Sequence, residues 1–144
     1  VIDAFPDLRF ALAHGIGFHQ AFLDRAARLP NVWVDSSALT IQVRLAREGS
    51  VITAPEGERF PADYRHPGRV LRALARAYPG RILWGSDTPA YCYICRRRQG
   101  GDTIAEFRLK ARYEDEVAAL RFLPGDLARE VSNRNTLDFL FGLS

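Results

Sequence analysis

Three short apolar segments, separated by helical patterns, restrict the fold of this chain more than any other feature of its sequence. They cover residues 7–13, 32–34 and 81–85, and proline, glycine or asparagine stands beside each of them. Short runs rich in Leu, Val, Ile, Phe and Trp next to such turn residues are typical of buried β-strands. The sequence therefore predicts three strands.

Amphipathic helices are predicted between these strands, because apolar residues recur there every three or four positions. The helical segments are residues 18–29, 38–48 and 68–78. Their expected inward faces are Phe18, Phe22, Ala26 and Leu29, then Leu39, Val43 and Ala46, then Val70, Leu71, Leu74 and Ala77. Strands that alternate with helices form βαβ units with a parallel sheet covered on both faces. We therefore predict an α/β fold.

The remaining segments are predicted to be two long loops and further helices. Residues 49–67 and 88–102 are rich in Gly, Pro and charged residues, and loops of this length are uncommon unless they are functional or flexible. We expect a helix over residues 103–123, another that opens at Pro124, and a short apolar helix over residues 135–142.

A polar side chain follows each predicted strand: His14, Asp35 and Asp87. The carboxyl ends of parallel strands meet at one edge of a sheet, so we expect these three side chains on one face. Imidazole nitrogen and carboxylate oxygen suit a divalent metal such as zinc, which would polarise a carbonyl or lower the pKa of bound water. Without a metal, the same groups can transfer protons.

Structural roles for these side chains stay open at this point. Asp87 can cap a turn before Pro89, and His14 can be a hydrogen-bonded residue within a glycine turn. Asp35 can bind substrate together with Ser36 and Ser37, or the aspartate can form an Asx-type cap.

Composition limits the expected partners. The net charge is +3, but Lys110 is the only lysine, and the arginines are spread along the chain among acidic residues. A bias in residue usage explains this spread better than a nucleic-acid footprint, so we expect no nucleic-acid partner. No apolar run approaches the roughly 20 residues of a membrane helix, and we expect no membrane partner.

The cysteines and the first residue also carry expectations. Cys92 and Cys95 are the only cysteines and have the spacing of half a zinc site, a weak signal without a second pair. Two cysteines make no disulfide framework, which favours a cytoplasmic location. The chain begins at Val1 rather than methionine, as expected of a processed, trimmed or partial product.

Four segments together resemble the last third of the amidohydrolase-related family. They are Phe-Ala-Leu-Ala-His-Gly at residues 10–15, Asn-Val-Trp-Val-Asp-Ser-Ser at 31–37, Arg-Ile-Leu-Trp-Gly-Ser-Asp-Thr-Pro at 81–89, and the closing helix at 135–143. The resemblance is most specific in the combination of Gly-Ser-Asp-Thr-Pro with His-Gly. The family includes metal-dependent hydrolases, lactonases, and decarboxylases of carboxylated aromatic or unsaturated acids.

The resemblance implies a fold and a role for four residues. The family fold is a (β/α)8 TIM barrel, and the three predicted strands look like strands six to eight. Asp87 matches the strand-eight aspartate, a metal ligand or proton-transfer group, and His14 matches the strand-six histidine beside the metal. Asp35 and Ser36 match the end of strand seven, where we expect substrate binding. The family's His-x-His of strand one and its strand-five histidine are absent from this sequence.

We therefore expect residues 1–144 to form one domain, the C-terminal portion of an incomplete amidohydrolase-like barrel. With a divalent metal, which we expect to be zinc, the enzyme would hydrolyse or non-oxidatively decarboxylate a small carbonyl or carboxylate substrate. The isolated chain would be inactive, and its macromolecular partner would be the missing N-terminal half or a second copy of itself. The alternative is a catalytically silent α/β module for oligomerisation or anion binding.

Overall fold

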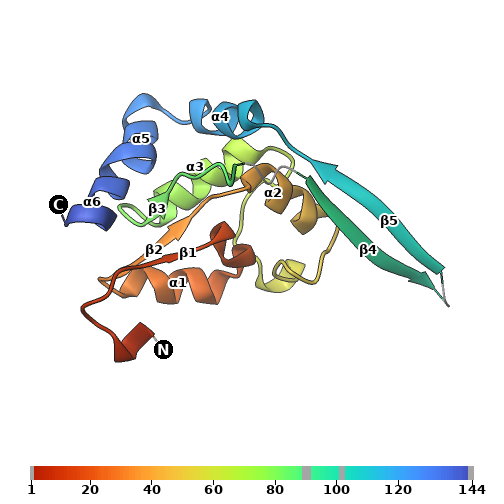
Figure 1. The fold of residues 1–144 in the computed structure, drawn as a ribbon, viewed down its shortest axis with the longest axis horizontal. Helices are drawn as coiled ribbons and strands as arrows, with labels where there is room; N and C mark the ends of the chain where they lie inside the picture. The colour runs from red at the N-terminus through yellow and green to blue at the C-terminus, as the bar shows by residue number, and fades with distance from the viewer. Residues whose placement is uncertain (1, 89–91, 101–102, 143–144) are drawn as a thin grey trace.

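Three parallel strands form the centre of the structure. The computed structural model describes residues 2–88, 92–100 and 103–142 (Figure 1). The central sheet has the strand order β1-β2-β3, with bounds β1 (Phe10–Leu12), β2 (Val32–Asp35) and β3 (Ile82–Leu83). Both strand pairs are parallel, with Leu12 opposite Val34 and Asp35 opposite Leu83. The predicted α/β fold is confirmed, and these three strands do not close a barrel.

The middle strand is the most buried of the three. Val32, Trp33 and Val34 of β2 are all buried, because strands flank β2 on both sides and helices cover it. In β1, Ala11 is exposed, as expected for an edge strand. In the part of the chain that the structure describes, no further strand pairs with the outer edges of β1 and β3. Open edges of this kind normally acquire a partner or a cover.

Among the described residues, six α-helices surround or follow the sheet. Their bounds are α1 (Gln20–Arg28), α2 (Leu39–Arg47), α3 (Pro67–Ala77), α4 (Tyr113–Arg121), α5 (Gly125–Arg129) and α6 (Asn135–Phe141). A π-helical turn at Glu130–Arg134 joins α5 to α6, and Gly142 ends α6 in a left-handed conformation. Single 3-10 turns occur at Ile2–Ala4, His14–Phe18 and Glu56–Glu58.

Two of the predicted inward faces need correction. Phe22 was expected in the core but is 54% exposed, while Leu23 is buried. The reason is that α1 begins only at Gln20, so Phe18 lies before the helix and its burial does not set the phase of the helical face. In α3, Ala75 is buried and Ala77 is exposed in the last turn.

A β-hairpin replaces the loop predicted at residues 88–102 and the first part of the helix predicted at 103–123. Strands β4 (Cys92–Gly100) and β5 (Thr103–Lys110) pair antiparallel, and helix begins only at Tyr113. Residues 105–110 alternate between apolar and polar types with the period of two that strands require. The sequence Gly-Gly-Asp at 100–102 is a hairpin signal that outweighs the helical spacing.

The base of the hairpin packs against α2. Leu109 and Ala111 form a buried cluster with Ala38, Ile41 and Leu45. Beyond this cluster the ribbon of β4 and β5 extends away from the rest of the molecule (Figure 1). The hairpin, which follows β3 in the chain, is thereby anchored on the helix that follows β2.

Helices α3 and α4 approach closely at Gly68. A Cβ atom added to Gly68 would lie 2.5 Å from Cβ and 2.7 Å from Cγ of Phe122, which directly follows α4. Neither Phe122 atom is the free end of a flexible side chain, so the backbone of one helix would have to move. The contact therefore requires glycine for reasons of space.

Replacement of Gly68 by alanine is expected to destabilise the protein by about 1–3 kcal/mol, the usual cost of overpacking. Urea unfolding of the purified chain measures this change. Gly125→Ala is the matched control, because a Cβ at Gly125 meets nothing within 4 Å and alanine is the better helix former. Equal stability of the Gly68 and Gly125 variants would contradict this packing account.

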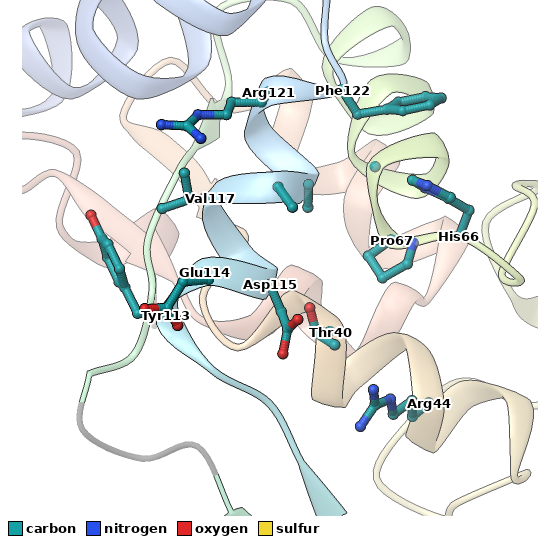
Figure 2. A pocket seen from close by; sticks show the side chains of 13 residues that line it. Thr40, Arg44, His66, Pro67, Tyr113, Glu114, Asp115, Val117, Arg121 and Phe122 are labelled. Atoms are coloured by element: carbon teal, nitrogen blue, oxygen red, sulfur yellow. The ribbon is translucent and has the colours of Figure 1, made fainter.

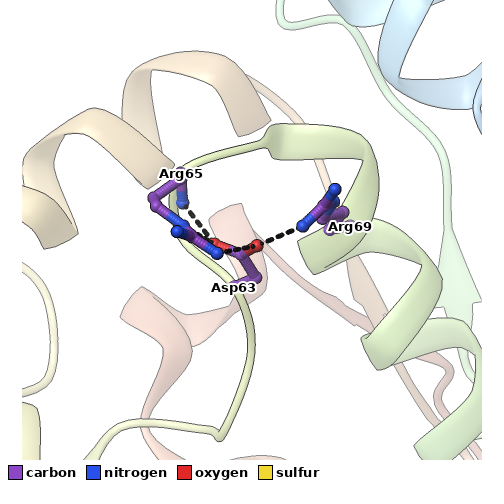
Figure 3. A network of polar contacts seen from close by, with 3 residues as sticks. All are labelled: Asp63, Arg65 and Arg69. Atoms are coloured by element: carbon purple, nitrogen blue, oxygen red, sulfur yellow. Dashed lines mark hydrogen bonds and ion pairs between the residues drawn. The ribbon is translucent and has the colours of Figure 1, made fainter.

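Two polar networks hold the helices at their ends. Asp63 accepts hydrogen bonds from Arg65 and Arg69 at 2.6–3.1 Å, just before α3 (Figure 3). The hydrogen bonds from Arg65 hold the pKa of the Asp63 carboxyl well below its usual range. At the far end of α3, the Tyr78 hydroxyl donates to Asp24 of α1 at 2.9 Å.

Candidate active site at the carboxyl end of the sheet

His14, Ser37 and Asp35 form a hydrogen-bonded cluster where β1 and β2 end. The backbone N–H of His14 donates to Asp35 Oδ1 at 3.1 Å. The His14 ring nitrogen Nδ1 lies 3.0 Å from Ser37 Oγ and 3.1 Å from the Ser37 carbonyl oxygen. The Ser37 hydroxyl donates in turn to Asp35 Oδ1. The structure therefore brings together two of the three predicted strand-end residues and joins them through a serine.

The contacts of Nδ1 indicate which tautomer the neutral His14 ring adopts. The Ser37 carbonyl accepts only, and the Ser37 hydroxyl already gives its hydrogen to Asp35. Nδ1 must therefore carry the hydrogen in the neutral ring, which leaves the lone pair on Nε2. The partner of one ring nitrogen commonly sets the chemistry of the other in this way. Nε2 is the atom of His14 that can accept a proton or bind a metal.

Asp35 organises its own turn. Oδ1 accepts the Ser37 N–H at 2.9 Å, which is the Asx-type contact that the sequence left open. Ser36 is 3% exposed, and its buried hydroxyl has no hydrogen-bond partner in the described residues. The family resemblance points to Ser36, whereas the structure places Ser37 beside the histidine. The sequence does contain a signal for Ser37, because it lies two residues after Asp35, which is the spacing of an Asx-type turn.

Asp87 lies on the segment that leaves β3 beside the same serine. A Cβ at Gly85 would be 3.3 Å from Ser37 Cβ, so glycine allows the end of β3 to approach this serine closely. Two residues later, Asp87 is exposed. Within the described residues, no hydrogen bond joins its carboxylate to His14 or Asp35. Pro89, the last residue of the Gly-Ser-Asp-Thr-Pro motif, lies outside the described residues.

Left-handed backbone conformations gather at this edge of the sheet. Among the described non-glycine residues with positive φ, three follow β1, one follows β2 and one follows β3: His14, Ile16, Phe18, Ala38 and Asp87. Each L-residue in this region costs about 1–3 kcal/mol, and such strain concentrates at active sites and ligand clamps. The strain thus marks the carboxyl ends of all three strands.

A separate pocket of about 730 Å³ lies between α4 and the N-terminal ends of α2 and α3 (Figure 2). Thr40 and His66 line one side of it, and the His66 ring packs against Phe122 with 4.6 Å between ring centroids. The strand-end residues His14, Asp35 and Asp87 do not line this pocket. It is therefore distinct from the strand-end cluster.

The strand-end residues include side chains that can bind a metal, but too few of them lie together to form a complete site. Nε2 of His14 and the carboxylate of Asp87 are both ligands that zinc accepts. Across residues 2–88, 92–100 and 103–142, no three His, Cys, Asp or Glu side chains gather into a group that could hold a metal ion. A zinc site needs three or four ligands. A metal bound at this edge would therefore need ligands from outside these residues.

Parallel strands with polar, strained carboxyl ends define the class of α/β proteins that hold their ligands at that edge of the sheet. The family model for amidohydrolases matches residues 1–127 of this chain. The chain therefore belongs to the amidohydrolase family, whose fold is a TIM barrel and whose members generally bind divalent metals. Searches among curated proteins and among solved structures found no match to it.

In the described part of the chain, no helix is both long enough and apolar enough to cross a bilayer.

Proposed function

We propose that this chain supplies the last three βα units of an amidohydrolase barrel that hydrolyses or non-oxidatively decarboxylates a small carbonyl or carboxylate substrate. The observation that carries the proposal is the His14–Ser37–Asp35 cluster, which leaves the Nε2 lone pair available at the carboxyl edge of the sheet. Membership of the amidohydrolase family supports the type of chemistry.

The proposed roles follow from the contacts of each residue. His14 Nε2 takes a proton from water or substrate, or serves as a metal ligand, and Asp87 provides a carboxylate for the same purposes. Asp35 Oδ1 accepts hydrogen bonds from the backbone N–H groups of His14 and Ser37, which leaves Oδ2 to bind substrate. Ser36 is the second residue that we propose for substrate binding. A divalent metal, which we propose to be zinc, would supply a polarised carbonyl or an acidic water molecule.

The rest of the barrel, or a second copy of the chain, is the proposed partner. Exposed apolar side chains occur near β1 and on α6: Phe5, Leu8 and Phe22, and Leu137, Leu140 and Phe141. Helix α6 begins at β3, where the Asn135 side chain donates to the Ile82 carbonyl at 2.8 Å, and its last turn lies near Arg9, where the Phe139 carbonyl accepts a hydrogen bond. These exposed apolar side chains are suited to packing against further βα units. We also propose a cytoplasmic location, because two cysteines make no disulfide framework.

The alternative is a silent module for oligomerisation or anion binding. The hairpin favours it, because β4 and β5 extend away from the molecule and the sequence of β4 contains three consecutive arginines at 96–98. A two-stranded ribbon is marginal without a partner.

Elemental analysis and activity assays separate the two proposals. We expect a protein that contains all eight strands to bind stoichiometric divalent metal and to turn over amides, lactones or carboxylated aromatic acids. The 144-residue chain assayed in parallel is expected to show no turnover. A metal-free, inactive oligomer in both preparations would support the silent module and overturn the enzymatic proposal.

A further inference from the structure

The turn between β2 and α2 contains a strained residue directly beside the strand-end cluster. Ala38 has φ 51° and ψ 31°, the left-handed region that L-residues other than Asn and Asp rarely occupy. It is the N-cap of α2 and directly follows Ser37, the residue that contacts the His14 ring. Ala38 therefore joins Ser37 directly to the start of α2.

Two carboxylates hold the backbone on either side of Ala38. Asp35 accepts the N–H of Ser37 at 2.9 Å, and Glu116 accepts the N–H of Thr40 at 3.0 Å. Glu116 belongs to α4, lies 76 residues along the chain from Thr40, and is 1% exposed. A strained backbone conformation persists in a folded protein when several contacts around the residue hold it in place.

Apolar packing adds a third restraint on the turn. Ala38 is 4% exposed and lies in the buried cluster formed by Ile41 and Leu45 of α2 with Leu109 and Ala111 at the base of the hairpin. The segment that follows β3, from β5 to α4, therefore encloses the turn that follows β2. Figure 2 shows Thr40 at the start of α2, facing the first turn of α4.

We propose that Glu116 is a positioning residue, which holds the β2–α2 turn so that Ser37 remains hydrogen-bonded to His14. The hydrogen bonds of Glu116 and Ser37 can be tested without an activity assay. An effect of Glu116 on turnover rests on the proposed function. The residue acts through its acceptor oxygen rather than its charge. Burial raises the pKa of the Glu116 carboxyl, while the hydrogen bond from the Thr40 N–H opposes that rise.

Amide exchange and nitrogen-detected NMR of the 144-residue chain test the proposal. Glu116→Leu removes the acceptor for the Thr40 N–H, and we expect exchange at Thr40 and Ser37 to accelerate by about tenfold or more relative to the Val70 amide. The ring-nitrogen chemical shifts of His14 should move in the same variant, because Nδ1 loses its fixed partner. Glu116→Gln keeps an acceptor oxygen and should leave both signals close to those of the unmodified chain.

Tyr78→Phe is the control for general destabilisation. It removes the hydroxyl that donates to Asp24, between α1 and α3, and should leave the His14 ring signals unchanged. If Glu116→Leu does not fold, Glu116→Asp withdraws the carboxylate by one methylene and should produce the same changes to a smaller extent. Unchanged His14 signals in the leucine or aspartate variant, or equal changes in the glutamine and leucine variants, would overturn the proposal. None of these readouts depends on enzymatic activity, so the proposed function can fail independently.

Discussion

Replacement of Asp87 by asparagine, in a protein that carries the whole barrel, is expected to lower kcat by about 10²- to 10⁴-fold, the usual contribution of a proton-transfer group. Asp87 is exposed at the end of β3 with φ 60°. Asparagine tolerates this left-handed backbone, so the substitution removes the charge and the proton acceptor while it preserves the chain path. Steady-state kinetics together with elemental analysis measure the effect.

Two comparisons make the Asp87 experiment specific. Asp7→Asn changes another exposed aspartate, which precedes β1 and lies away from the strand ends, and should leave kcat unchanged. If Asp87 is a metal ligand, its substitution should lower the metal content as well as kcat; if it transfers protons only, the metal content should persist. Turnover and metal content both equal to those of the unmodified enzyme would refute a site role for Asp87.

Replacement of Phe18 by alanine is expected to destabilise the chain by about 3–5 kcal/mol, the usual cost of removing a buried aromatic ring. Phe18 is fully buried and packs edge-on against Tyr64, with 5.2 Å between ring centroids. Its carbonyl oxygen accepts the Phe60 N–H at 2.8 Å, so the residue also anchors the long segment before α3. Equilibrium urea unfolding gives the free energy of unfolding for each variant.

Phe22→Ala is the matched control for the Phe18 variant. The two phenylalanines are four residues apart, and helical periodicity predicts that both face the core. Phe22 is 54% exposed, so its loss should change the free energy of unfolding by no more than about 0.5 kcal/mol. Similar losses for the two variants would show that the phase of α1 differs from the one described.

The positions of these two phenylalanines show where prediction from sequence succeeds and where it stops. The spacing of apolar residues predicts a helix in this part of the chain, and α1 is present. The spacing does not reveal that the chain first passes through the turn His14–Phe18, with several residues at positive φ. That turn changes which phenylalanine enters the core.

The hairpin is the clearest case of a misleading local pattern. Ile104, Phe107 and Ala111 have helical spacing, yet the first two lie in β5 and the third follows it. Residues 105–110 fit a period of two equally well, and a segment of this length cannot decide between the periods alone. Pairing with β4 and the contact of Leu109 with α2 select the strand.

The sequence predicts which residues lie at the candidate site, and packing decides which of them form hydrogen bonds with one another. The rule that polar residues follow buried strands identifies His14, Asp35 and Asp87, because the carboxyl ends of parallel strands share one edge. The rule says nothing about which of them touch. The sequence favoured Ser36, yet Ser37 contacts His14, because the chain turns after β2 and Asp35 Oδ1 holds the Ser37 N–H.

Local periodicity and short motifs are therefore enough to predict the three parallel strands, the α/β class and the amidohydrolase family. These features depend on residues close together in the sequence, where spacing reports directly on secondary structure. The link from His14 to Asp35 spans 21 residues and the link from Thr40 to Glu116 spans 76. Such contacts arise when the elements pack, because the geometry of the whole chain then places a carboxylate against one particular backbone N–H.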